Sequence, residues 1–269
     1  MKSLPLCLLV VVALPFTSLG QVAGGEGSSA DEIAHKLADP SAAIVSVPFQ
    51  YNYLGEVGPG GDSHNEVLKI QPVIPFVGEK GKFILRPILP LLSNQFPADE
   101  SGVGDLLVQG YYIPNREGAT VETGFGPVVA FNTASDDTLG AGKWSIGPAF
   151  VFVHKTADRK WTLSALVNHL WSVAGDNDRP DVSQTSLQPI VARSFPHSWT
   201  MTFSSESSYN WHADSGDAWT VPLGVNVSKV LKLGGHPVSF GLGGFYDVER
   251  AELANKWSVR LTATLVIPE

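Results

Sequence analysis

The 269-residue sequence has few charged residues, a single cysteine and no long apolar run after its first 20 positions. Charged residues make up 16% of it, against roughly 25% in an average soluble domain. One cysteine excludes a disulfide framework and a cysteine-based zinc site. Because no further run reaches about 20 apolar residues, helical membrane spans are excluded beyond the amino terminus. A net charge of −8 argues against nucleic acid as a partner, since phosphate binding requires a basic face.

Apolar residues (43%), aromatics (10%), glycine (27) and proline (19) are plentiful. This apolar and aromatic content excludes a disordered chain. No nucleotide-binding loop, paired catalytic carboxylates or metal-spaced histidine cluster accompanies it. We therefore expect no cofactor and no metal, and we expect that the chain is not an enzyme.

The first 20 residues have the pattern of a secretory signal peptide. Lys2 precedes an apolar stretch over 4–16, and small residues around Gly20 suit cleavage after that position. Cys7 lies inside the apolar stretch and not at the cleavage point, which argues against a lipoprotein. Removing residues 1–20 also removes Lys2, so the net charge changes from −8 to −9. The sequence thus predicts an exported, cysteine-free protein of a bacterial envelope.

Residues 21–42 are predicted to be a periplasmic leader with one short helix. The helix is expected over 31–39, with its cap near Ser29 and its end before Pro40. No helical pattern follows this segment.

From residue 43 onward the chain alternates in polarity with period two. In 257–267, for example, Trp257, Val259 and Leu261 share one face, while Ser258 and Arg260 share the other. Segments of this kind are predicted near 43–54, 65–76, 83–93, 104–113, 119–132, 143–154, 160–173, 181–194, 198–210, 218–229, 237–247 and 256–267. An even number of strands of membrane-crossing length is typical of a transmembrane β-barrel. We therefore predict an all-β, up-and-down antiparallel barrel of about 12 strands over 43–269, with both termini periplasmic.

The connections between these segments alternate in charge and length. Those expected outside the cell are long and acidic, near 55–64, 94–103, 133–142, 174–180, 211–217 and 248–255. The others are mostly shorter and carry Lys80, Lys155, Arg159, Lys160, Lys229 and Lys232. Aromatic residues collect at strand ends, as interfacial girdles require. The pattern favours the outer membrane, with its lipid and the barrel-assembly machinery as partners.

A soluble β-sandwich or a lipocalin-like barrel is the alternative, because alternation alone does not distinguish a core from lipid. Strand length favours the membrane, since soluble strands are usually about five to six residues long. Six prolines argue the other way, because each removes a ladder donor inside a predicted strand: Pro72, Pro87, Pro127, Pro148, Pro189 and Pro222. We expect them to mark bulges or bends.

Five stretches carry a resemblance more specific than periodicity: 37–52, 70–75, 139–148, 168–175 and 225–232. They resemble an outer-membrane transporter family labelled "meta-pathway of phenol degradation", over nearly the whole mature chain. The resemblance implies an outer-membrane barrel that passes small, aromatic or hydrophobic molecules, and it brings no ligand residues. One departure from barrels in general is the ending at Glu269, which lacks a terminal aromatic residue.

The polar faces of the predicted strands give the candidate lumen lining. By parity it includes Lys69, Gln71, Arg86, Gln109, Glu122, Gln184, Gln188, Glu206 and Arg260. Barrel closure places the three basic residues in one sector and the two glutamates on the far side, which would orient dipolar solutes. We expect a channel for passive passage of small solutes. The alternative is that these charges pair and plug a structural or adhesive barrel.

An outer-membrane lipid hydrolase is a further alternative, because such enzymes place a histidine and a serine on the lipid-facing side. His169 falls on the outward face of its segment, but the same-face position two residues on is Trp171, not a serine. We expect His169 to be an interfacial residue.

Overall fold

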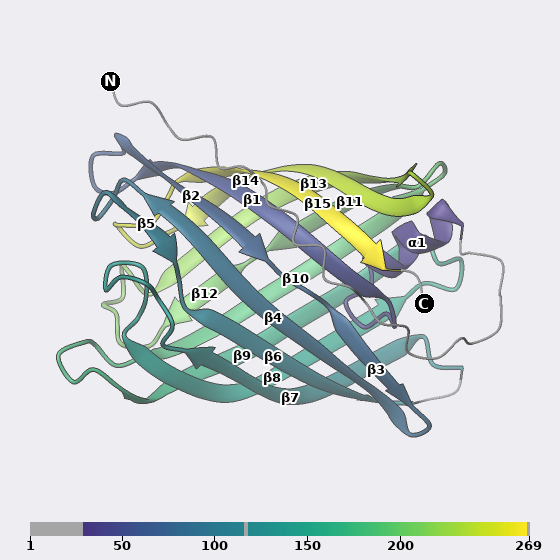
Figure 1. Ribbon diagram of the computed structural model, residues 1–269, viewed down its shortest axis with the longest axis horizontal. Coiled ribbons are helices and arrows are strands. Elements are labelled where there is room, and N and C mark those ends of the chain that lie inside the picture. The colour runs from purple at the N-terminus through teal and green to yellow at the C-terminus, as the bar shows by residue number, and fades with distance from the viewer. Residues whose placement is uncertain (1–28, 116–117, 268–269) are drawn as a thin grey trace.

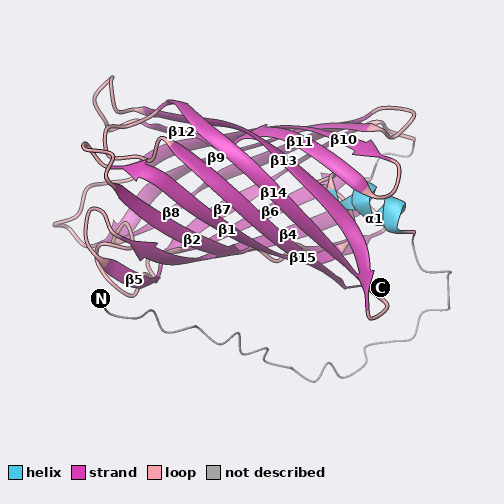
Figure 2. Ribbon diagram, turned by 90° about the horizontal axis from the view of Figure 1, so that it is seen from above, coloured by secondary structure: helices cyan, strands magenta, loops and turns pink. Residues whose placement is uncertain are grey.

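The strands of the computed structural model, which describes residues 29–115 and 118–267, close into one antiparallel barrel (Figures 1 and 2). β1 pairs with β2 on one side and with β15 on the other, so the hydrogen-bonded path has no open edge. Three crossings are each divided into two segments, β2 and β3, β5 and β6, and β11 and β12, so fifteen segments make twelve crossings. The expected signal peptide at 1–20 lies outside the described residues.

The helix and strands have the following bounds: α1 Ala30–Leu37, β1 Val45–Val57, β2 Ser63–Ile70, β3 Ile74–Gly78, β4 Gly81–Asn94, β5 Glu100–Val103, β6 Leu106–Pro114, β7 Val121–Phe131, β8 Lys143–Lys155, β9 Trp161–Gly175, β10 Ser183–Phe195, β11 Trp199–Ser205, β12 Ser207–Asn210, β13 Trp219–Leu233, β14 His236–Glu249 and β15 Trp257–Ile267. They follow the twelve predicted segments closely, so the predicted barrel is confirmed. Three lysines expected in connections instead lie inside strands, Lys155 in β8 and Lys229 and Lys232 in β13.

Alternation along each strand separates an outer face from an inner one. In β8 the outward Trp144, Ile146 and Phe150 are exposed, while the inward Ser145 and Val151 are buried. Side chains in a strand point alternately to the two faces of the sheet. Large exposed apolar side chains continue around the barrel, so its outer surface suits hydrocarbon.

Prolines interrupt the ladders in facing pairs. Pro127 lies opposite Pro148, and the flanking pairs Ile70–Leu89 and Ile74–Leu85 place Pro72 opposite Pro87. Neither member of such a pair has an N–H to donate, so one gap in the ladder accommodates both.

Pro189 and Pro222 lie on the two strands that flank the break between β11 and β12. Pro222 also coincides with a register shift between β13 and β14. The expectation of bends at in-strand prolines therefore applies here and at the break between β2 and β3, which contains Pro72.

The helix α1 lies at one end of the barrel, which we name the helix end (Figure 2). Ser29 caps it, because its Oγ accepts a 3.1 Å hydrogen bond from the Glu32 backbone N–H. The strand turns at this end are short, such as Gly234–Gly235 between β13 and β14. The opposite end, the loop end, carries longer connections. Among the described residues, no helix is long and apolar enough to cross a membrane.

Candidate functional site in the barrel lumen

The inner faces of the strands surround a central cavity of about 560 Å³. Seven of the nine predicted lining residues border it: Lys69, Gln71, Arg86, Gln109, Gln188, Glu206 and Arg260. Gln184 lies further along β10, opposite Leu170 and Asn210. Glu122 lies on β7 outside this cavity, toward the helix end.

Glu206 receives two cations from across the lumen. Its carboxylate lies 3.2 Å from Lys69 Nζ and 2.7 Å from Arg260 Nη1. Glu206 lies between β11 and β12, whereas Lys69 is on β2, five strands along the path β12–β13–β14–β15–β1–β2. The basic and acidic sectors were expected to face each other across an open lumen. The structure instead joins Glu206 to Lys69 and Arg260, as in the alternative of paired lumen charges. These side chains are long enough to meet, and a charge partly removed from water is stabilised by a partner.

Neighbouring side chains hold Arg260 in this bridge. Its Nε donates a 2.7 Å hydrogen bond to Asn52 Oδ1, and its guanidinium lies 4.2 Å from the Phe245 ring centroid. The Asn52 amide in turn donates to the Val67 carbonyl at 3.3 Å. Sequence reasoning missed Asn52, although its place on the polar face of the first strand was a readable signal.

A second ion-pair cluster lies nearer the helix end. Glu122 lies 2.6 Å from Lys82 Nζ and 2.7 Å from Lys155 Nζ. Lys155 also lies 2.8 Å from Asp39, just after α1. The cluster therefore ties the segment after the helix to the barrel wall. Lys82 is four residues before Arg86 and so lies on the same strand face, which could have identified Lys82 as a lumen residue. Asp39 had no such signal, because it precedes the alternating segments.

Arg86 differs from these cations, because it forms no ion pair with any described residue. Its Nη1 donates to Gln109 Oε1 at 3.4 Å. Arg86 borders the central cavity and also a second cavity of about 270 Å³, between α1 and the wall. It therefore lies where the two meet.

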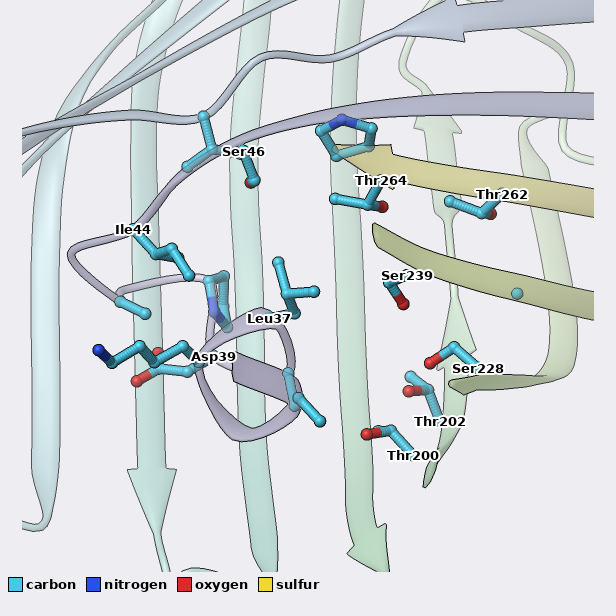
Figure 3. Close-up of a pocket in the computed structure, with 18 of the residues that line it drawn as sticks. Leu37, Asp39, Ile44, Ser46, Thr200, Thr202, Ser228, Ser239, Thr262 and Thr264 are labelled. Atoms are coloured by element: carbon cyan, nitrogen blue, oxygen red, sulfur yellow. The ribbon is translucent and has the colours of Figure 1, made fainter. Parts of the chain in front are cut away.

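The inner wall has two contrasting sides. An apolar arc of buried side chains covers β4 and β6 to β9, with members Ile84, Tyr111, Ile113, Val128, Ala149, Val151, Val153 and Leu166. The opposite side is a hydroxyl wall: Thr200, Thr202, Ser228, Ser239, Thr262 and Thr264 (Figure 3). Packed apolar side chains thus fill one side of the barrel interior, and hydroxyl groups line the other.

The helix α1 packs inside the barrel against β11, β13 and β14 (Figure 3). Ile33 and Ala34 are buried with Val230 and Val266. Ser198 Oγ donates a 2.7 Å hydrogen bond to the Asp31 carboxylate, and this hydrogen bond holds the Asp31 pKa below its usual value. The leader helix therefore narrows the helix end of the lumen.

His169 lies on the outer face of β9, near the loop end. Its Nδ1 shares a 2.8 Å hydrogen bond with Thr185 Oγ1 on β10, and Ser183 Oγ lies 3.5 Å from its Nε2. Trp171 packs on the ring at 4.0 Å, and Trp211 Nε1 donates to Thr185 at 2.9 Å. Hydrogen-bonding aromatic groups of this kind are typical of a membrane interface.

A closed antiparallel barrel, apolar outside and charged within, has the architecture of outer-membrane channels and porins. No model of a known family and no curated protein matches this chain. Its fold is similar to an outer membrane channel from Pseudomonas putida F1, at 14% identity and a TM-score of 0.62, over 84% of this chain and 96% of that chain. It is also similar to the NanC porin, at 9% identity and a TM-score of 0.53, over 83% and 98%. At these identities the likeness shows the fold alone, so the phenol-degradation label is not confirmed.

Proposed function

We propose that this chain is an outer-membrane channel through which small solutes pass passively, without a cofactor or energy coupling in its own chain. The observation that carries the proposal is a cavity of about 560 Å³, lined by charged, polar and apolar side chains, inside a barrel with an apolar outer surface. A cavity of this size accommodates a small organic molecule. The similarity in fold to an outer membrane channel and a porin supports the same function.

The solutes we propose are small aromatic or hydrophobic compounds. The family resemblance in the sequence suggests this class, and apolar side chains that border the cavity, Ile88, Leu107 and Ile190, are compatible with it. We further propose that the helix end faces the periplasm and the loop end faces outward. Short turns inside and longer loops outside are typical of bacterial barrels, which supports this orientation.

Planar-bilayer recording on the folded mature chain tests the channel. We expect discrete conductance steps, and flux of small aromatic solutes in liposome-swelling assays. Folding is verified in the same preparation by β-rich circular dichroism and by migration on gels that changes on heating. Folded protein without conductance or solute flux would refute the channel.

A plugged structural or adhesive barrel is the second candidate. Two observations favour it: α1 packs inside the lumen, and Glu206 bridges the lumen to Lys69 and Arg260. The bilayer experiment separates the two candidates, because a plugged barrel folds and inserts but passes neither ions nor solutes.

The lipid-hydrolase alternative depends on His169 with Ser183 on the adjacent strand. The 3.5 Å separation between Ser183 Oγ and His169 Nε2 is longer than an established nucleophile–base hydrogen bond. We propose that His169 anchors the barrel at the interface and that the protein is not an enzyme. Phospholipid hydrolysis by the folded protein, lost in His169→Ala, would overturn this proposal.

A further inference from the structure

Arg86 is the one cation bordering the central cavity that has no carboxylate partner among the described residues. Lys69 and Arg260 share Glu206. The other acidic group on the cavity, Asp105, is held by loop backbone: its carboxylate accepts the N–H groups of Thr133, Ala134 and Ala141 at 3.0, 3.1 and 2.7 Å. Neither carboxylate is therefore paired with Arg86.

Charge on the cavity wall favours an anion. Three cations border it, Lys69, Arg86 and Arg260, against the two carboxylates of Asp105 and Glu206. The excess is one positive charge, which a monoanion would balance. Because a charged group away from bulk water is stabilised by a partner, Arg86 is where that monoanion gains most.

Arg86 itself offers donors to an acceptor group on a solute. Arg86 is the sixth residue of the fourteen in β4, deep within the crossing. Its Nη1 donates to Gln109 Oε1, and a guanidinium carries five N–H donors, so donors remain for a solute. The planar fork of a guanidinium suits a planar carboxylate.

Apolar side chains flank this site. Ile88, Leu107 and Ile190 border the same cavity as Arg86, and Ile190 also borders the cavity beside α1. A solute whose carboxylate binds Arg86 can therefore place an apolar body against these residues. Removing that body from water adds to the affinity in proportion to its apolar area.

We propose that Arg86 is the centre of a binding subsite for monocarboxylates with an apolar body. Arg86 lies where the two cavities meet, so a solute moving along the lumen passes it. The inference deepens the proposed channel function and rests on it for the path by which a solute arrives. With this subsite, the channel would prefer anionic amphipathic solutes to neutral ones.

The test uses the folded mature chain with hexanoate and benzoate as probes, and acetate, hexanol and benzyl alcohol as comparisons. Calorimetry in detergent measures binding, and single-channel recording measures block of the open current. Arg86→Gln is the test variant. Arg193→Gln is the matched control, because Arg193 is exposed and stacks on Trp161 and Phe195. All variants are measured in the same detergent, so partitioning of the probes into micelles contributes equally to each and cancels in the comparison.

We expect hexanoate and benzoate to bind the wild type and Arg193→Gln equally, and to bind Arg86→Gln about tenfold or more weakly. Acetate and the two alcohols should bind weakly to all three. Arg86→Lys should bind at an intermediate level, since it keeps the charge and loses the planar fork.

Equal binding of hexanoate to the wild type and Arg86→Gln would overturn the subsite. Acetate binding as tightly as hexanoate would overturn the apolar preference. Arg86-dependent binding without any conductance would refute the channel and leave the subsite standing. Conductance together with binding that does not depend on Arg86 would refute the subsite and leave the channel standing.

Discussion

Glu206 pairs with two cations that reach it from distant strands, so its removal has a definite electrostatic sign. In Glu206→Gln, Lys69 and Arg260 keep their charge without a counter-charge, and the channel should become more selective for anions. Arg260→Ala leaves Glu206 with Lys69 alone and should shift selectivity toward cations. The reversal potential across a potassium chloride gradient measures both. Shifts in the same direction would contradict this role for Glu206.

The strand register gives a second prediction at the residue scale, on two adjacent positions of β15. Leu261 is 51% exposed on the outer face, while Thr262 borders both cavities. Leu261→Arg should impair insertion, because arginine costs about 2–4 kcal/mol at the lipid midplane. Thr262→Arg should insert normally and reduce conductance. The fraction of heat-modifiable protein after refolding into liposomes measures insertion.

Leu223→Arg, on the outer face of β13, is an independent repeat of this test, since Leu223 is 52% exposed. Harmless arginines at both leucines, together with failed insertion of Thr262→Arg, would mean that the two faces are reversed.

Asp31 makes docking of the helix dependent on pH. The hydrogen bond from Ser198 lowers the Asp31 pKa, so the folded state favours the ionised carboxylate. Docking is therefore fully stabilised above the ordinary carboxyl pKa of about 4 and loses this contribution as pH falls through the lower folded-state value. We expect faster proteolysis of the leader at about pH 3 than at about pH 6. Asp31→Asn, which keeps an acceptor without titrating, should remove that difference.

At the scale of elements, we predict that α1, which packs inside the barrel, limits how far the lumen is open. Ile33→Asp places a charge among Val230, Val266 and Ala34 and should undock the helix. We expect higher single-channel conductance and an unchanged barrel by circular dichroism. Glu32→Gln changes the same helix away from the buried cluster and serves as the control. Unchanged conductance in Ile33→Asp would mean that the helix does not restrict the path.

The sequence predicts the elements better than their contacts. Alternation with period two reports on neighbouring residues, so the twelve crossings were predictable, as was a helix capped by Ser29. The position of α1 inside the barrel was not, because strand periodicity contains no information about what fills a lumen. Pairing of the lumen charges remained one of two alternatives for a similar reason: parity gives the face of a residue, but not how far its side chain reaches.

The orientation proposed for the whole molecule rests on the asymmetry between its two ends. We predict that an epitope inserted beside Asp136, at the loop end, binds antibody on intact cells. The same epitope between Gly234 and Gly235, at the helix end, should bind only after the outer membrane is permeabilised. Flow cytometry measures both. The opposite pattern would place the helix end outside.

The bridge from Glu206 to Lys69 and Arg260 also has a mechanical consequence. A closed ladder fixes the circumference of a barrel through its strand number and stagger, but the cross-section can still flatten or round without breaking a backbone hydrogen bond. An ion pair that joins walls five strands apart fixes the length of one chord. The bridge therefore constrains how elliptical the cross-section of the barrel is. Salt, which screens such pairs, should make that shape more compliant.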